Sequence, residues 1–185
     1  MTTALLFLTA PTTSPTQISH LLLSLQQHNP EESFHLVLSK IRLEPRPRNL
    51  RGFDDHSIAK ETSLPVPPSL DNGWAGARLD EVEEFVTDQR LHHGVEAVNQ
   101  TMYFVVDERG MADETCVLGV LRYEDDSSGD EGECGRRYDR VRMPWDEAEI
   151  VLVNVGVGNM ELRDFVDREK GADENGWWQF VTVHE

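Results

Sequence analysis

The sequence contains few of the features that mark a secreted or a membrane-spanning protein. Cysteine occurs twice, as Cys116 in an apolar run and Cys134 in an acidic, glycine-containing stretch, so a disulfide framework is not expected. No apolar run approaches the roughly 20 residues that cross a bilayer. The first run, at residues 4–8, is too short for a signal peptide, and no Lys or Arg precedes Lys40. We therefore predict a cytoplasmic protein with no membrane partner.

Positive charge is also scarce. The chain carries 17 Lys and Arg against 34 Asp and Glu, a net charge of −17. Residues 1–60 hold 6 basic and 5 acidic residues, so residues 61–185 hold the other 11 and 29, a net of −18. Such a surface repels phosphate backbones, and nucleic acid is not an expected partner. The acid excess serves solubility, attracts a basic protein partner or mimics nucleic acid.

The clearest helix start follows an apolar run at residues 4–8, which has the pattern of a buried strand. Ser14 is a good N-cap, Pro15 suits the first helical position, and Gln17 is placed to close a capping box. The next apolar residues have the spacing of one helical face: Ile18, Leu21, Leu22 and Leu25. We predict a helix that starts at Pro15 and stops before Pro30.

The rest of the chain alternates strand-like and helix-like segments. The strand that follows Ser33 is expected to change its buried face near Ser39, as at a bulge. Two strands that flank an acidic turn at residues 124–135 are expected to form a hairpin. The patterns predict strands at residues 34–43, 102–106, 116–123, 138–143 and 177–183, and a helix at residues 79–91.

Toward the C-terminus the patterns are less decisive. Residues 150–157 are apolar and fit either a strand or a helix. Asn159 is expected to cap a helix that carries Phe165 and is closed by Gly171. The predicted elements together indicate an α/β fold. We expect a single domain over residues 1–185, with a mixed sheet of about five or six strands and two or three packed helices.

Residues 44–73 form a long segment without periodicity. It holds five of the nine prolines and a basic patch that runs from Arg42 to Arg51. Irregular segments of this length are unusual in a compact domain, and such a segment is either functional or partly disordered. Within it, Asp54, Asp55 and His56 place two carboxylates beside an imidazole, a combination suited to proton transfer.

Asp107 is a further candidate for acid–base chemistry. If the preceding strand runs parallel to a neighbour, Asp107 lies at its carboxyl end, where open α/β sheets place ligands. Trp74, Trp145 and Asn159 are candidate ligand-binding residues. The simpler alternatives are a turn residue for Asp107, core packing for the tryptophans and a helix cap for Asn159.

Metal and phosphate motifs are missing from the sequence. No His-Glu-x-x-His, Cys-x-x-Cys or His-x-His occurs, and the adjacent His92 and His93 would point apart on a helix. The acidic loop that begins at Glu124 fails as a calcium loop, because Gly135 stands where a bidentate Glu is needed. The glycines before Asn159 lack the third glycine and the lysine of a phosphate-binding loop. We expect no metal and no cofactor.

Four pieces of the sequence carry a family resemblance. They are the Leu5-Leu6 strand with its capped helix, Phe53-Asp54-Asp55, Tyr103-Phe-Val-Val-Asp107-Glu-Arg followed by Val117-Leu-Gly-Val-Leu121, and Asn154-Val-Gly-Val-Gly-Asn159-Met160-Glu-Leu-Arg-Asp-Phe165. In these pieces the chain resembles a family of domains of unknown function (family 6924) found in bacteria and fungi. The last piece is the most specific, because it is similar to the family's Asn-Leu-Ser-Leu-Ala-Asn-Met-Asp-Phe-Glu-Glu-Phe segment.

The chain departs from that family pattern in the position of a tryptophan and in two loops, because the long Pro-rich loop and the loop at Asp125–Glu133 are expanded. A tryptophan closely precedes the Asn-Met segment in the family, whereas Trp145 lies further upstream here. The resemblance implies the fold and the extent of the domain, and it implies no activity.

Two functions are compatible with these residues. The first is a non-catalytic binding protein that engages a protein partner or a small ligand through its acidic surface or its long loop. The second is a cofactor-independent acid–base enzyme, of the isomerase, cyclase or dehydratase type, that uses Asp54, Asp55, His56 or Asp107. The first is favoured, because no constellation of residues defines an active site.

Overall fold

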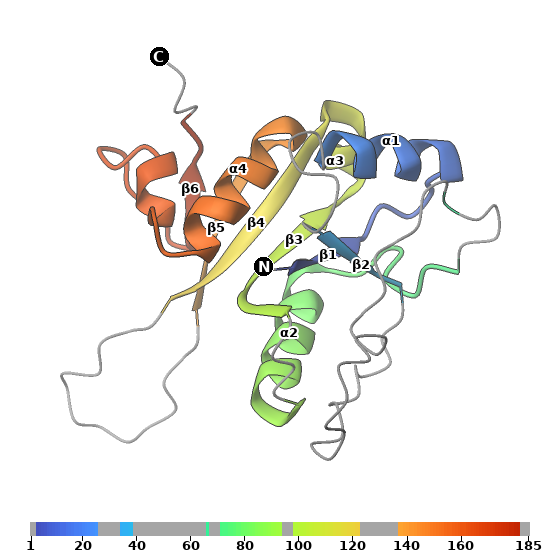
Figure 1. Ribbon diagram of the computed structural model, residues 1–185, viewed down its shortest axis with the longest axis horizontal. Helices are drawn as coiled ribbons and strands as arrows, with labels where there is room; N and C mark the ends of the chain where they lie inside the picture. The colour runs from blue at the N-terminus through green and yellow to red at the C-terminus, as the bar shows by residue number, and fades with distance from the viewer. Residues whose placement is uncertain are drawn as a thin grey trace, which may run out of the picture.

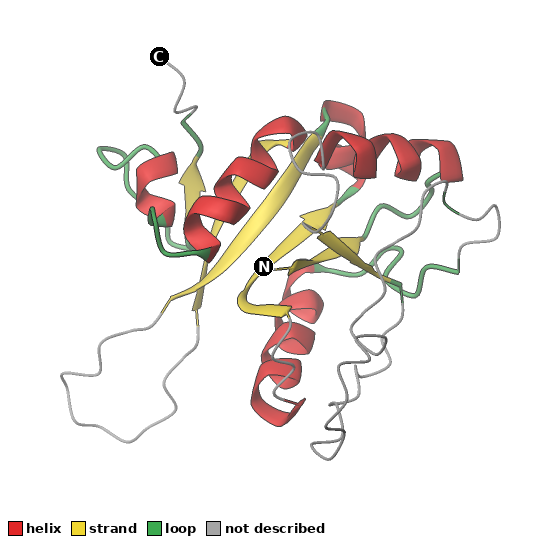
Figure 2. Cartoon of the chain, in the orientation of Figure 1, coloured by secondary structure: helices red, strands yellow, loops and turns green. Residues whose placement is uncertain are grey.

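The computed structural model describes residues 3–25, 34–38, 66, 71–93, 98–122 and 137–181. These residues form one six-stranded sheet in the order β2-β1-β3-β4-β5-β6, with helices on both of its faces (Figures 1 and 2). The strands are β1 (Thr3–Leu8), β2 (Phe34–Val37), β3 (Val98–Val106), β4 (Thr115–Arg122), β5 (Arg137–Pro144) and β6 (Trp177–Gln179). The helices are α1 (Pro15–Leu25), α2 (Leu79–His93), α3 (Glu108–Asp113), α4 (Trp145–Gly156) and the 3₁₀ helix η1 (Leu162–Phe165).

The sheet is mixed, as the sequence predicts. Strands β2, β1 and β3 are parallel, β4 is antiparallel to both of its neighbours, and β5 and β6 are parallel to each other. The predicted hairpin is confirmed, because β4 and β5 pair from Thr115 opposite Pro144 to Arg122 opposite Arg137. The α/β class, the strand number and the mixture of strand directions are therefore all confirmed.

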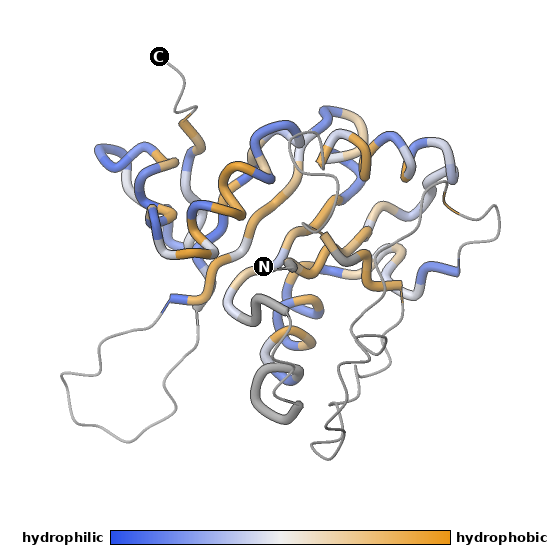
Figure 3. The backbone as a smooth tube through the Cα atoms, viewed as in Figure 1, coloured by the Kyte–Doolittle hydropathy of each residue, from blue (hydrophilic) through white to orange (hydrophobic). Residues whose placement is uncertain are grey.

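Alternation along the strands gives the sheet two apolar faces. On β1, Leu6 and Leu8 face the layer formed by α1 and α4. These two helices are in contact and lie on the same side of the sheet (Figure 1). Leu5 and Phe7 face the opposite layer, which contains α2. Apolar residues accordingly follow the strands through the middle of the molecule in Figure 3. Three layers result, with the sheet in the centre.

The first helix begins as the sequence predicts. The side chain of Ser14 accepts the N–H of Gln17 at 3.2 Å, and Gln17 accepts the N–H of Ser14 at 2.9 Å. This reciprocal pair is the capping box, and it satisfies two backbone donors at the start of α1. The four residues predicted for its apolar face, Ile18, Leu21, Leu22 and Leu25, are all buried.

The apolar segment at residues 150–157 is helical. It forms the second half of α4, whose buried face includes Val151 and Leu152. The helix ends at Gly156. Gly158, with a φ of +71°, then turns the chain so that the N–H groups of Asn159 and Met160 reach the carbonyl of Asn154. Glycine adopts this left-handed conformation without the strain a Cβ brings.

The predicted cap at Asn159 is wrong. Glu161 is the N-cap of η1, because its side chain and that of Asp164 form a capping box. Asn159 donates instead to the side chain of Asn154 at 2.8 Å, so it closes the preceding helix. The predicted helix around Phe165 is a single 3₁₀ turn, and Gly171 does not close it.

The outer edge of β6 is covered. Val166 forms an antiparallel bridge with Phe180. The N–H of Asp167 donates to the carbonyl of Gln179 at 2.9 Å, and the N–H of Val181 donates to the carbonyl of Phe165 at 2.9 Å. The segment after η1 therefore folds back along the last strand.

Of the long segment at residues 44–73, the structure describes Val66 and residues 71–73. Val66 is buried, and its N–H donates to the hydroxyl of Ser19 on α1. The candidate residues Asp54, Asp55 and His56 lie outside the described residues, as does the predicted change of phase near Ser39. Among the described helices, none combines the length and the apolar character that a membrane span requires.

Replacing Ser14 with Ala should lower the free energy of unfolding by about 1 kcal/mol, because the capping hydrogen bond at the start of α1 is lost. Urea denaturation measures this difference. Thr12→Ala, a truncation at an exposed position just before the cap, is the matched control and should change stability by less than about 0.5 kcal/mol. Equal effects of the two substitutions would contradict the capping role.

Candidate functional site

Two arginines of β5 organise the polar part of the sheet. Arg140 and Arg142 alternate with Val141, which is buried in the layer of α1 and α4, so the arginines project toward the layer of α2. Their partners across the pairing with β4 are Gly119 and Val117. Arg142 reaches across β4 to Asp107 after β3, and Arg140 meets Glu83 of α2.

Gly119 makes room for an aromatic ring to cross β4. Tyr103 on β3 lies opposite Gly119, and a Cβ at Gly119 would come within 2.1 Å of the Tyr103 ring carbon Cζ. The ring therefore lies over the glycine backbone. Its hydroxyl reaches Glu83 on α2 and donates to the Oε1 atom at 2.5 Å. Burial and the charge of Glu83 raise the pKa of Tyr103 well above its ordinary value of 10.0, so the hydroxyl stays a donor.

Arg140 completes this network. Its Nε and Nη2 atoms each donate to one oxygen of Glu83 at 2.7 Å, and its Nη1 donates to the carbonyl of Asn175 at 2.8 Å. The side chains of Glu83 and Arg140 are 13% and 20% exposed, so the pair is largely withdrawn from water. A nearby hydrogen bond of 3.0 Å between the hydroxyls of Thr87 and Tyr138 also joins α2 to β5.

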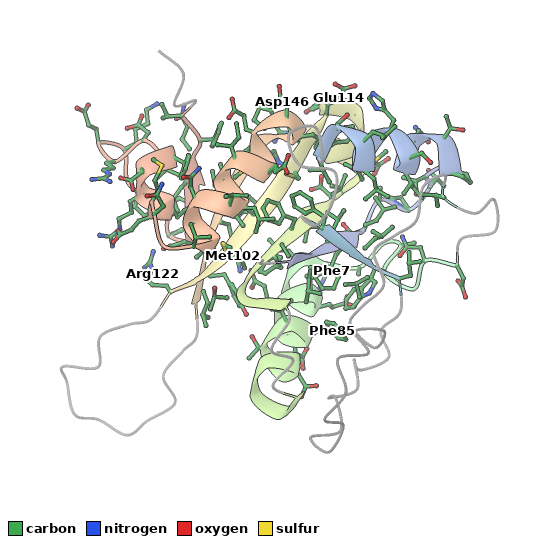
Figure 4. The ribbon with its side chains drawn as sticks, viewed as in Figure 1. Phe7, Phe85, Met102, Glu114, Arg122 and Asp146 are labelled. Atoms are coloured by element: carbon green, nitrogen blue, oxygen red, sulfur yellow. The ribbon has the colours of Figure 1, made fainter. Side chains whose placement is uncertain are left out.

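A pocket of about 420 Å³ opens beside this network. Arg122, labelled at the end of β4 in Figure 4, stands in its wall, where it is paired with Asp139. The pocket lies between α2, the β4–β5 pair and the turn that precedes β6. Its lining consists of Glu83, Arg122, Tyr138, Arg140 and residues 172–176. The wall is mostly polar.

The turn at residues 172–176 is held firmly against β5. One oxygen of Asp173, Oδ1, accepts the N–H groups of Asn175 at 2.8 Å and Trp177 at 2.9 Å. The carbonyl of Gly176 accepts the N–H of Arg140 at 2.8 Å. Gly176 has a φ of +80°, and a Cβ there would lie 2.9 Å from the carbonyl oxygen of Tyr138. The wall of the pocket is therefore preformed.

Arg142 pairs with Asp107, the candidate that the sequence placed after β3. Its Nη2 donates to Oδ2 of Asp107 at 2.5 Å, and its Nη1 donates to Oδ1 and to the hydroxyl of Thr115, each at 3.1 Å. Oδ1 also accepts the N–H of Gly110 at 2.7 Å, which makes Asp107 the N-cap of α3. Asp107 is not among the residues that line the pocket described above.

The environment of Asp107 does not suit a general base. Burial raises the pKa of this carboxyl, but the hydrogen bond and charge of Arg142 and the N–H of Gly110 outweigh burial. The pKa therefore lies below its ordinary value of 3.8, and the ionised form is held in place. A base with a depressed pKa has little tendency to take up a proton at neutral pH.

As expected for a ligand-binding position, Asp107 lies at the carboxyl end of a strand that is parallel to β1. The strand order reverses there, since β2 and β3 lie on opposite sides of β1. The chain itself occupies this point. The N–H of Thr9 donates to the carbonyl of Val106 at 2.9 Å, and the N–H of Gly76 donates to the carbonyl of Thr9 at 2.8 Å. Residues 72–76 are therefore hydrogen-bonded to the chain at the end of β1, where such sheets usually bind ligands.

The other predicted binding residues, Trp74 and Trp145, are packed inside the protein. Trp74 is 1% exposed, and its ring centroid lies 4.9 Å from that of Phe7 and 5.0 Å from that of Phe85. Phe7 and Phe85, both labelled in Figure 4, meet edge to face with their ring centroids 5.9 Å apart. Trp145 is 3% exposed and donates to the carbonyl of Thr115 at 2.8 Å. Both tryptophans thus belong to the core.

Cys116, which the sequence places in an apolar run, lies in the core. Cys116 is fully buried, and burial raises its pKa to about 12 despite the charge of Arg142. A thiol in this state is not a nucleophile at neutral pH.

Sequence reasoning missed the residues of the pocket. A signal was present in β5, where Tyr138, Arg140 and Arg142 occupy one face and Val141 and Met143 the other. Polar residues at every second position usually indicate a wet face. The partners of the arginines come from distant parts of the chain, and the alternation does not indicate which carboxylates they meet.

Fold and site together define an α/β domain with a preformed polar pocket at the β5 side of its sheet. The chain belongs to the family described as Domain of unknown function (DUF6924), whose model matches residues 52–179. The match includes the pocket, and it leaves β1, α1 and β2 outside, so the resemblance noted at Leu5-Leu6 falls beyond it. No curated protein and no solved structure matches the chain.

Replacing Gly119 with Ala should destabilise the protein by about 1–3 kcal/mol, because the added Cβ displaces a ring that is fixed by Glu83. Thermal or urea unfolding measures the loss. If the clash with the ring is the cause, Gly119→Ala should cost less when Tyr103 is already Leu. Additive losses in that double-mutant cycle would contradict the mechanism.

Replacing Asp107 with Asn should lower stability by about 1 kcal/mol at pH 7, because Asn keeps the helix cap but loses the charged pair with Arg142. The lowered pKa means that the contribution is complete above the unfolded value of about 3.9 and is lost as pH falls through the folded value. In urea unfolding, the stability difference between the two proteins should therefore be smaller near pH 2 than at pH 7. Asp113→Asn, which alters an exposed pair with Arg109, is the control expected to show little difference at either pH.

Proposed function

We propose that the protein is a non-catalytic binding protein that holds a small polar ligand in the pocket between α2, β5 and residues 172–176. The observation that carries the proposal is the construction of this pocket. The Glu83–Arg140 pair and the Asp173 turn fix its walls, so a ligand meets a preformed site and little ordering is needed. Its volume is at the lower end of the range for small-molecule sites, which favours a small ligand.

Binding is a better match than acid–base catalysis for the described groups. Catalysis of that kind needs a group whose pKa lies near the working pH. The pKa of Tyr103 is raised and that of Asp107 is lowered, so each moves away from neutrality. Glu83, the carboxylate in the pocket wall, accepts hydrogen bonds from Tyr103 and Arg140 and serves as a structural anchor.

The net charge of −17 gives the ligand a further constraint. A polyanion approaching such a protein is repelled, so nucleic acid is not a partner in this proposal. A ligand that carries a positive group is attracted over a distance of about 10 Å at 0.1 M salt. We place this binding function in the cytoplasm, in keeping with the paucity of cysteine.

The proposal is tested by NMR with the ¹⁵N-labelled full-length chain. The probes are four small compounds that carry different charged groups: a neutral monosaccharide, a cationic primary amine, an anionic monocarboxylate and the zwitterionic dipeptide alanyl-alanine. Binding should shift the amide signals of residues 138–142 and 172–176 for at least one probe, in a saturable way. The proposal is overturned if none of the four shifts these signals, or if the shifts lie elsewhere in the protein.

A further inference from the structure

We infer that the ligand of this pocket is a small zwitterion that presents a carboxylate and an ammonium group, as an amino acid or a short peptide does. The inference rests on the proposed binding function and concerns the chemistry of the ligand. The pocket wall holds a donor N–H and carboxylate acceptors that have no partner among the described residues, and a ligand with both kinds of group satisfies both.

Arg140 supplies the donor. A guanidinium has five N–H groups. Glu83 and Asn175 take three of them, and the adjacent hydroxyl oxygen of Tyr103 takes at most one more. Within the described part of the chain, at least one N–H is therefore left without a partner, on a side chain that is 20% exposed and lines the pocket. A partly buried guanidinium is a strong donor to a carboxylate oxygen.

The turn at residues 172–176 supplies the acceptors. Oδ1 of Asp173 is occupied by backbone N–H groups, but Oδ2 has no partner among the described residues. The carboxylate of Glu174 also has no partner among the described residues. Both residues line the pocket, and Asn175, which follows them directly, contacts Arg140. Acceptors and donor therefore belong to one small cavity.

Ligands with a single charge fit this arrangement less well. A simple anion finds Arg140 but faces Glu83, Asp173 and Glu174 in the same wall, within a protein of net charge −17. A simple cation finds the acidic turn but leaves the N–H of Arg140 without an acceptor when water is displaced, which costs free energy. A zwitterion avoids both penalties.

The test compares three forms of one ligand by NMR titration at low salt. Alanyl-alanine carries both charges, N-acetyl-alanyl-alanine lacks the ammonium group, and alanyl-alanine methyl ester lacks the carboxylate. We expect the dipeptide to bind at residues 138–142 and 172–176 at least about fivefold more tightly than either derivative. The inference is overturned, with the binding function intact, if a derivative or one of the singly charged or neutral probes binds there as tightly.

Two variants test whether the ammonium group of the ligand binds at the turn of residues 172–176. Glu174→Gln removes an exposed charge at the pocket and should weaken the dipeptide by about two- to fivefold, the range expected for an exposed ion pair. The acetylated form lacks the ammonium group, so it should bind this variant no more weakly than it binds the unaltered protein. Glu169→Gln removes an exposed charge outside the pocket and is the matched control. Equal weakening by the two substitutions would show a general effect of net charge and would overturn the assignment.

Discussion

The contact of the Tyr103 ring with the backbone of Gly119 is the constraint on which this half of the molecule depends. A side chain at position 119 would block the path across β4, and the tyrosine hydroxyl would not reach Glu83. Glu83 anchors α2 to the sheet and at the same time orients Arg140. The geometry of the pocket therefore originates in the absence of one Cβ in the middle of a strand.

The two arginines of β5 solve the same physical problem in different ways. Each places a guanidinium on a face that is otherwise apolar, and each is accommodated by a carboxylate from another element. Arg140 meets a helix and leaves space beside the pair, where the pocket lies. Arg142 meets Asp107 at the end of β3, where the carboxylate also caps α3. The second pair is fully engaged in holding β3, α3 and β5 together.

Local patterns in the sequence predicted much of the fold and little of the site. The capping box at Ser14, the hairpin of β4 and β5 and the mixed sheet follow from spacing and turn chemistry, which act over a few residues. The cap of η1 was misplaced because Asn159 and Glu161 both have capping side chains, and the choice depends on how the chain turns at Gly158 after α4 has ended. The pairing of Glu83 with Arg140 joins residues far apart in the chain, and the pattern of neither segment contains it.

The backbone cover on β6 has a consequence for how copies of the protein meet at high concentration. A bare outer strand presents a row of N–H and C=O groups on which another chain can extend the sheet. Here residues 165–167 already occupy those groups through the bridge of Val166 to Phe180 and the bonds at Gln179 and Phe165. Growth of a sheet from molecule to molecule at this side would first require that segment to detach. The short return of the chain after η1 thus acts as a barrier to fibre-like association.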